Sequence, residues 1–148
     1  MTATRSLSLD LLTAKRAMVA AEQAAEDIGV KATIVVLDGG GDLVAMTRMD
    51  GAWAGSFDLA LGKAHTARSF DAPSAAFVPL VQPGQPLFGV QAVSGGRYVI
   101  LGGGYPLRLR VEGDAVGALG VSGGTPDQDV EIAEAALRAV FALHMLAD

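Results

Sequence analysis

Residues 113–133 constrain the fold more than any other stretch, because a run of small residues leads directly into a helix start: GDAVGALGVSGGTPDQDVEIA. Thr125 is the predicted N-cap, a proline takes the first helical position, and Gln128 lies three residues after the cap. This pattern is typical of a capping box. Asp127 and Asp129 place negative charge in the first turn, where the helix dipole favours it. The stretch therefore predicts a strand, a glycine turn and then the last helix.

Apolar periodicity divides the rest of the chain into helices and strands. Apolar residues at three- to four-residue spacing predict helices, and apolar or β-branched runs between glycine turns predict strands. The predicted helices are residues 8–28, capped by Ser8, 56–70 and 126 to about 146, and the predicted strands are residues 32–37, 43–49, 97–101, 106–111 and 115–121. We expect one α+β domain, residues 1–148, with a five-stranded antiparallel sheet and helices packed on it.

Residues 71–96 are expected to be irregular, because they hold four of the six prolines of the chain. One short helix, ending near Val78, is predicted inside this segment, and the remainder is predicted to be loop. Loops of this length in a compact domain are usually functional or form interfaces.

Composition limits the classes of function. Apolar residues make up 51% of the chain and charged residues only 18%, which predicts that part of the apolar surface is buried in a homo-oligomer. The absence of cysteine excludes disulfides, thiolate metal sites and a cysteine nucleophile. A net charge of -5 without a basic cluster argues against nucleic acid as a partner. With no membrane-length apolar run and no visible export signal, we expect a cytoplasmic protein.

Common nucleotide and catalytic motifs are missing. Residues 57–64 are nearest to a phosphate loop, but they lack its first glycine and its final hydroxyl. No dinucleotide fingerprint follows a strand, and no hydrolase elbow surrounds Ser122. His65 and His144 fall in different predicted helices without carboxylates at ligand spacing, so no metal site is predicted.

Five short segments occur in a recognisable order: VLDGGGDL, RMDGA, KAHTA, GGGYPL and GALGVSGGTPDQD. Together they resemble the GlcG/HbpS-like family of haem-binding and haem-degrading domains, which includes the C-terminal domain of PduO-type proteins. The resemblance covers residues 9–143. It implies a profilin-like sandwich, assembly into dimers and octamers, and a ligand pocket near subunit interfaces. It also implies haem as a candidate cofactor, since some members bind or degrade haem.

The predicted helix 56–70 carries the first group of candidate site residues. Lys63 lies among alanines on a small-residue ridge, where it can bind a carboxylate or act as a base, or else extend along the surface. His65 points about 200° around the helix from Lys63 and is a candidate acid, base or haem ligand, or an interface histidine. Thr66 belongs to the same KAHTA motif and is a candidate for ligand binding. Gly62 inside a helix costs about 1 kcal/mol relative to alanine, which indicates a packing requirement.

A second group of candidates lies at strand ends. Arg48 can anchor a carboxylate with two hydrogen bonds or form a salt bridge, and Asp50 can share that site or hold the following turn. Arg97 and Tyr105 flank the glycine-rich corner, where they can line a pocket or pack at the edge. Trp53 and other loop aromatics can mark an interface or a ligand wall.

Two hypotheses of function with chemistry in a pocket follow, and a third interpretation is an assembly or chaperone-like subunit without such chemistry. In the first, the protein binds haem or another tetrapyrrole, with Lys63 and Arg48 on the propionates and His65 or a loop residue near the iron. In the second, it is a cofactor-free lyase, hydratase or isomerase of a small organic acid. Arg48 then binds the carboxylate, and Lys63 or His65 moves a proton.

Overall fold

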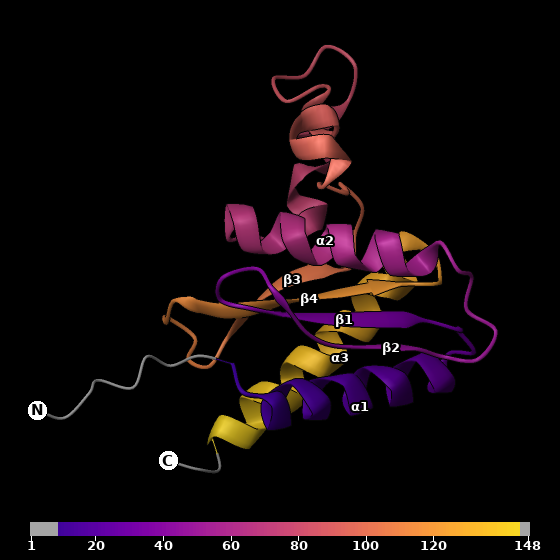
Figure 1. The fold of residues 1–148 in the computed structure, drawn as a ribbon, viewed down its shortest axis with the longest axis vertical. Coiled ribbons are helices and arrows are strands. Elements are labelled where there is room, and N and C mark those ends of the chain that lie inside the picture. Colours follow the sequence, from indigo (N-terminus) through magenta and orange to yellow (C-terminus); the bar gives the residue numbers. More distant parts are fainter. Residues whose placement is uncertain (1–8, 146–148) are drawn as a thin grey trace, which may run out of the picture.

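The computed structural model describes residues 9–145, and the side chains up to Val140. Its α-helices are separated by pairs of consecutive strands, which is consistent with the expected α+β class (Figure 1). In chain order they are α1 Leu11–Asp27, β1 Thr33–Asp38, β2 Leu43–Arg48, α2 Ser56–Phe70, the 3-10 helices η1 Ser74–Val81 and η2 Val90–Gly96, β3 Gly104–Arg108, β4 Ala115–Ser122 and α3 Pro126–Met145.

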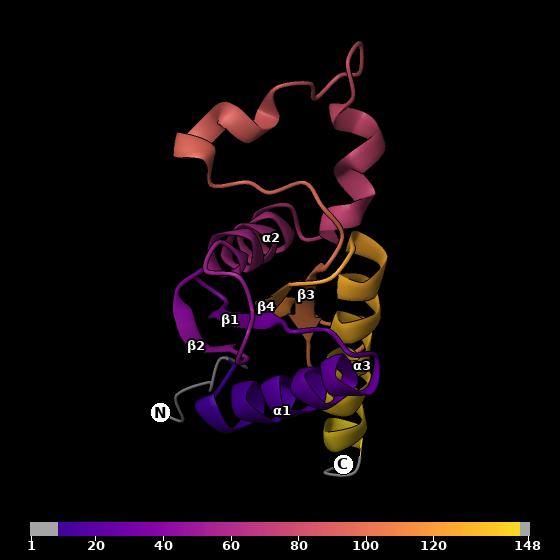
Figure 2. The same cartoon turned by 90° about the vertical axis from the view of Figure 1, so that its right-hand side faces the viewer.

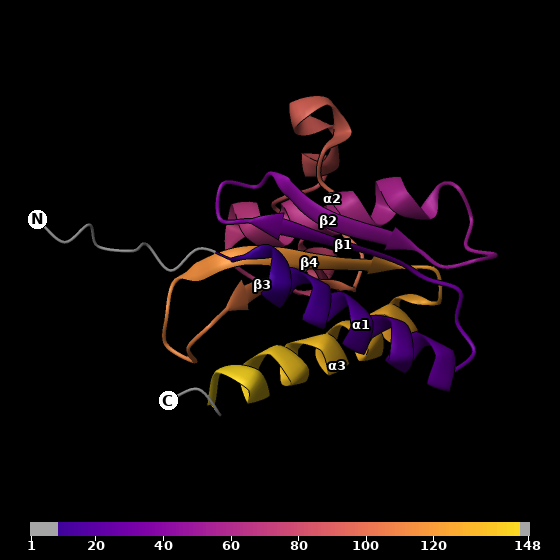
Figure 3. The same cartoon turned by 60° about the horizontal axis from the view of Figure 1, so that its bottom comes forward.

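The sheet is antiparallel throughout, with the strand order β2-β1-β4-β3 (Figure 3). β1 lies in the middle, where it pairs with β2 through Thr33 and Arg48 and with β4 through Thr33 and Ser122. Its run of β-branched residues is buried on both sides, as a central strand requires. The outer strands β2 and β3 form the two edges.

Helices cover both faces of the sheet, so the domain has three layers (Figure 2). α2 packs on one face against the side chains of Val35, Leu37 and Ala118. α1 and α3 pack on the other face, where the larger apolar cluster lies. Side chains of β1 and β4 alternate between these two clusters, because successive residues of a strand point to opposite faces.

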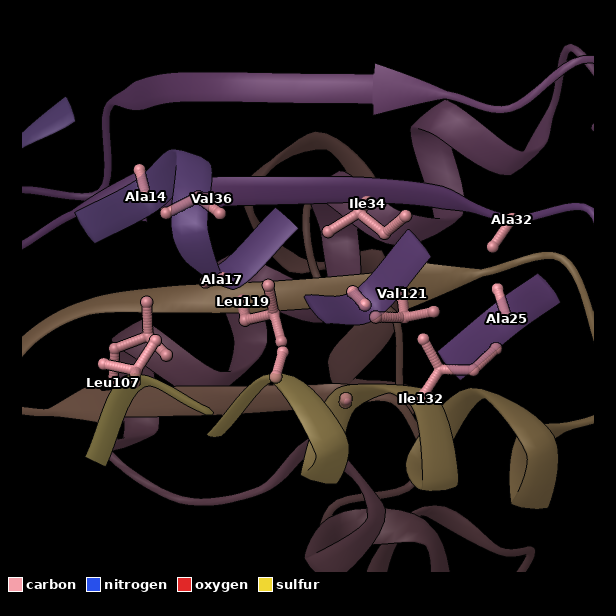
Figure 4. Close-up of a cluster of buried hydrophobic side chains, with 14 of the residues drawn as sticks. Ala14, Ala17, Ala25, Ala32, Ile34, Val36, Leu107, Leu119, Val121 and Ile132 are labelled. Carbon is pink, nitrogen blue, oxygen red and sulfur yellow. The ribbon is translucent and has the colours of Figure 1, made fainter. Parts of the chain in front are cut away.

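The larger cluster combines branched side chains from the sheet with alanines from the helices (Figure 4). The buried residues of α1 are Ala14, Ala17, Ala21 and Ala25, and α3 contributes Ala133 and Ala136. Because alanine is short, α1 and α3 can lie close to each other and to the strands. The sheet supplies the volume of this core through residues such as Ile34 and Leu119.

α2 approaches β4 so closely that a glycine is needed between them. A Cβ atom at Gly120 would overlap the carbonyl oxygen of Ala60 and lie 3.0 Å from the amide nitrogen of Ala64. A similar contact explains Gly62, where a Cβ would overlap the side chain of Val99. The packing requirement predicted for a glycine in the middle of this helix is therefore confirmed.

Residues 74–97 form an arm that rises away from the three layers on the side of α2 (Figures 1 and 2). At its base, where the arm leaves and rejoins the rest of the fold, aromatic rings cluster at the end of α2. The ring of Phe70 lies 5.2 Å from that of Phe77 and 5.1 Å from that of Tyr98, measured between centroids. Beyond this base the arm is solvated, and all residues from 82 to 89 are exposed.

The described residues form four strands, so the predicted five-stranded sheet is wrong. Residues 97–101 form no strand because their backbone is bound by side chains. The amide nitrogen of Val99 donates to Thr66 Oγ1 (3.0 Å), and the carbonyl oxygen of Leu101 accepts from Ser74 Oγ (2.6 Å). The strand predicted at 106–111 instead spans Gly104–Arg108.

Two predicted helix details also change. The N-cap of α1 is Asp10, whose side chain accepts a 2.8 Å hydrogen bond from the Thr13 amide. The predicted cap Ser8 lies outside the described residues. η1 is a 3-10 helix that continues past the predicted end at Val78 to Val81, and η2 falls where loop was predicted.

Gly120→Ala is expected to destabilise the fold by roughly 3 kcal/mol or more, because its Cβ would overlap the Ala60 carbonyl oxygen. Gly55→Ala is the matched control, since Gly55 has a φ of -68° and nothing within 4 Å of its Cβ position. That variant should stay within about 0.5 kcal/mol of the parent protein. Urea unfolding followed by circular dichroism measures both changes, and equal stability of the two variants would contradict the α2–β4 contact.

Candidate functional site

The candidate functional residues of α2 lie on two different faces of the helix. The inner face, against the sheet, holds Lys63 among buried alanines. The outer face holds Asp58, Leu61 and His65, which recur at helical spacing. As predicted from their separation of two residues, Lys63 and His65 point to different sides of the helix, and the structure does not bring them together.

Lys63 is buried and makes two hydrogen bonds. Its Nζ donates to Asp129 Oδ2 at 2.7 Å and to the carbonyl oxygen of Val121 at 2.9 Å. The side chains of Lys63 and Asp129 are only 2% and 3% exposed. The other carboxylate oxygen of Asp129 accepts from the amide of Gly124 at 2.9 Å. The pair thus joins α2 to the first turn of α3 across the end of β4.

Glycines at the start of β3 make room for this pair. A Cβ at Gly103 would lie 3.3 Å from Lys63 Nζ and 2.9 Å from Asp129 Cβ, and one at Gly104 would overlap the Lys63 carbonyl oxygen. The GGGYPL segment therefore has a structural role, because it lets the backbone of β3 pass beside the helix that carries Lys63.

Burial works against both charges of the pair. Desolvation lowers the pKa of Lys63, although the hydrogen bond and charge of Asp129 oppose this shift. Desolvation likewise raises the pKa of Asp129, against the opposing effects of Lys63 and the amides of Gly124 and Gly123. Each group offsets the cost of burying the other, so removal of one partner leaves a buried charge without compensation.

The base or ligand role predicted for Lys63 stays a prediction. In the structure its Nζ is held by Asp129 and Val121 and does not line a described cavity. Sequence reasoning missed Asp129 as the partner, because its position in the first turn was attributed to the helix dipole. A signal was present: Asp129 precedes the buried residues Ala133, Ala136 and Val140 at helical spacing, and so lies on the inner face of α3.

His65 lines a cavity of about 310 Å³ between α2 and the end of the arm. Asp58, Leu61, Gly62 and His65 form the helical wall, and residues 94–97 form the opposite wall. The structure therefore brings together His65 and Arg97, two of the predicted site residues. The cavity is open to solvent on the arm side, since residues 94–97 are exposed.

Thr66 holds the second wall of this cavity in place. Its Oγ1 donates to the Gly62 carbonyl oxygen (2.8 Å) and accepts from the Val99 amide (3.0 Å). Gly62 leaves the space that the Val99 side chain occupies. Thr66 is fully buried, and its hydroxyl is hydrogen-bonded to the backbone of Val99. This contact fixes the chain two residues after Arg97. The predicted ligand contact of Thr66 stays a prediction.

The environment of His65 favours the neutral imidazole. Burial lowers its pKa below the ordinary 6.5, the positive charge of Arg97 lowers it further, and Asp42 acts weakly in the opposite direction. At pH 7 the ring therefore carries one free nitrogen lone pair. A neutral imidazole can accept a proton or bind a metal ion.

The remaining predicted residues lie elsewhere. Arg48 and Asp50 are exposed at and just beyond the end of edge strand β2. The Tyr105 hydroxyl donates to Glu134 of α3 at 3.0 Å, and burial together with Glu134 raises its pKa to about 12. Tyr105 packs against the larger cluster, on the face of the sheet opposite α2. None of the three lines the His65 cavity.

The capping box predicted before α3 is confirmed. The Thr125 amide donates to Gln128 Oε1 at 2.9 Å, and the Gln128 amide donates to Thr125 Oγ1 at 3.2 Å. Among the side chains of residues 9–140, no three histidine or acidic groups gather into a metal-binding site. Within residues 9–145 no helix has the length and apolar character needed to cross a membrane.

Comparison with known proteins gives consistent matches over most of the chain. The family model described as haem degrading protein HbpS-like matches residues 9–138. An uncharacterised 15.0 kDa protein from the dhaT–dhaS intergenic region of Citrobacter freundii is 42% identical over 130 residues, covering 88% of this chain and 90% of that protein.

Two solved structures are similar along nearly their whole length. The Klebsiella pneumoniae protein ORFY superposes with a TM-score of 0.88 at 36% identity, covering 96% of this chain and 97% of that one. PduOC, crystallised as a complex with haem, superposes with a TM-score of 0.85 at 32% identity, covering 90% of this chain and 95% of that one.

Lys63→Met is expected to lower the free energy of unfolding by about 3–5 kcal/mol, because it leaves the Asp129 carboxylate buried without its counter-ion. Asp129→Leu should cost a similar amount. The double variant removes both charges and should lose clearly less than the sum of the two single losses. Urea unfolding of all three variants tests this, and additive losses would show that the two side chains are not coupled.

Proposed function

The chain belongs to the family of HbpS-like haem-degrading proteins, and on this premise we propose that it binds haem in the cavity beside His65. The observation that carries the proposal is the pairing of a partly buried, neutral imidazole with a guanidinium across one cavity. A relative of the same fold, PduOC, has been crystallised with haem.

The residues of the cavity fit the chemical groups of haem. Neutral imidazole is a common axial ligand of haem iron, and the pKa of His65 is lowered in the direction that keeps it neutral. Arg97 supplies a guanidinium suited to a propionate carboxylate. Leu61 supplies apolar surface on the helical wall. Bound haem would supply a redox-active iron centre.

The volume of the cavity indicates a partly exposed ligand. At about 310 Å³ it lies at the lower end of the range of small-molecule pockets, roughly 300–1,000 Å³. The cavity of one chain would therefore cover part of the macrocycle and leave the rest open to a neighbouring molecule.

We propose that this neighbour is a second copy of the chain and that the arm makes the contact. The arm exposes several large apolar side chains: Leu80, Leu87, Phe88 and Val93, with Phe88 65% exposed. Such a concentration on a segment that projects from the domain is typical of a protein interface. Residues 94–97 at the end of the same arm line the His65 cavity, so association would act directly on the site.

The cofactor-free alternative has less support in the structure. It assigns Arg48 to the substrate carboxylate and Lys63 or His65 to the proton transfer. Arg48 is exposed on an edge strand and does not line the His65 cavity, and Lys63 is enclosed between α2, β4 and α3. Neither candidate base therefore shares a described cavity with Arg48.

Titration with haemin is expected to give a shifted Soret band that saturates at one haem per chain, and His65→Ala should weaken binding by about tenfold or more. His144→Ala is the matched control, since His144 is the only other histidine and its helix lies on the opposite face of the sheet from α2 (Figure 1). It should bind haemin as the parent protein does.

The pH dependence gives a second test of the same site. Because the pKa of His65 is lowered, the affinity for haemin should be constant from pH 8 to pH 7 and fall only once the pH drops below about 6.5.

An unchanged Soret spectrum in His65→Ala, or an equal loss of haemin binding in His144→Ala, would overturn the assignment of His65.

Phe88→Ser is expected to shift the protein toward smaller species, because each copy would lose an apolar contact worth about 1.5–3 kcal/mol. Val111→Ser is the matched control, since Val111 is 86% exposed but lies in the β3–β4 turn, away from the arm. Size-exclusion chromatography with light scattering compares the three proteins. A parent protein that is monomeric at high concentration, or a Phe88→Ser variant of unchanged mass, would contradict an interface on the arm.

A further inference from the structure

A second cavity, of about 320 Å³, lies at the end of the sheet where β1 begins and where β2 and β4 end. It is bounded by residues 29–31, Gly51, Trp53, Gly123, Gly124 and Gln128. It shares no lining residue with the His65 cavity. We infer that this cavity binds a small carboxylate with a flat apolar body, such as an aromatic acid.

Close backbone packing shapes the walls of this cavity. A Cβ at Gly123 would overlap the Lys31 carbonyl oxygen, so the turn after β4 lies directly against the segment before β1. At Gly51, whose φ is +85°, a Cβ would lie 3.6 Å from Lys31 Cγ. Lys31 is exposed, and its aliphatic part lies beside the backbone of Gly51.

The polar side chains of the cavity offer hydrogen-bond donors. Lys31 is the only charged residue of the lining, and it makes no ion pair with another described residue. Gln128 Oε1 is used by the Thr125 amide, so the side chain of Gln128 presents its NH₂ group. The indole of Trp53 is a donor only. A set of donors with one positive charge and no carboxylate is suited to an anion.

Trp53 indicates the shape of the remainder of the ligand. It is 83% exposed, although large aromatic residues are normally buried for the most part. Its loop is fixed all the same: the Trp53 carbonyl oxygen accepts from the Ser56 amide at 3.0 Å, and Ser56 Oγ is 2.6 Å from Thr33 Oγ1 in a buried contact. An exposed indole that lines the same cavity as Lys31 can stack on a flat ring whose carboxylate reaches the Lys31 ammonium group.

Benzoate is the probe for this inference, and Trp53 reports on it directly because it is the only tryptophan of the chain. Fluorescence is excited at the red edge of indole absorption, where benzoate is transparent. Benzoate should change the emission saturably. Benzamide keeps the ring without the charge, and acetate keeps the charge without the ring. Each should bind about tenfold more weakly than benzoate or not measurably.

Lys31→Met retains the aliphatic stem and should weaken benzoate binding about tenfold. Lys15→Met is the matched control, because Lys15 is an exposed lysine on α1 that does not line the cavity. His65→Ala should bind benzoate normally, so failure here is distinguishable from failure of the haem proposal. Circular dichroism confirms that each variant is folded.

Three outcomes would overturn the inference. Equal binding of benzamide would exclude anion recognition, and equal losses in Lys31→Met and Lys15→Met would exclude Lys31 as the anchor. A Trp53 emission that changes with protein concentration and not with benzoate would show that a second copy of the chain covers the cavity.

Discussion

The close approach of α2 to the sheet is the contact on which the rest of the structure depends. Gly120 lets the backbone of α2 lie directly on β4. This close approach allows the side chain of Lys63 to reach Val121 and Asp129. With Lys63 fixed inward, helical geometry turns His65 outward. Gly62 and Thr66 then hold the returning arm against the outer side, where His65 and Arg97 share a cavity. One helix thus separates a buried structural charge pair from an open candidate site.

Local chemistry could be predicted from the sequence where it is decided by neighbouring residues. The capping box at Thr125 and Gln128, the packing requirement at Gly62 and the opposite orientation of Lys63 and His65 all follow from short-range spacing, and the structure confirms them. The antiparallel α+β arrangement follows in the same way from hairpin turns and helical periodicity.

Tertiary contacts decided what the sequence did not reveal. Residues 97–101 have the composition of a strand, but the hydroxyls of Thr66 and Ser74 bind their backbone in place of a neighbouring strand. Asp129, the partner of Lys63, is 66 residues away in the chain, so no local sequence pattern connects the two residues. Arg97 could be placed near a glycine corner, but only the path of the arm brings it to His65.

The Lys63–Asp129 pair has a consequence for the order in which the protein can form. During synthesis α2 leaves the ribosome long before α3, which is the last helix among the described residues. Until α3 arrives, Lys63 has no carboxylate to compensate its burial, so docking of α2 against the sheet is unfavourable in the incomplete chain. Docking of α2 in its final position is therefore favourable only once the first turn of α3 lies beside it, which couples the two helices in folding.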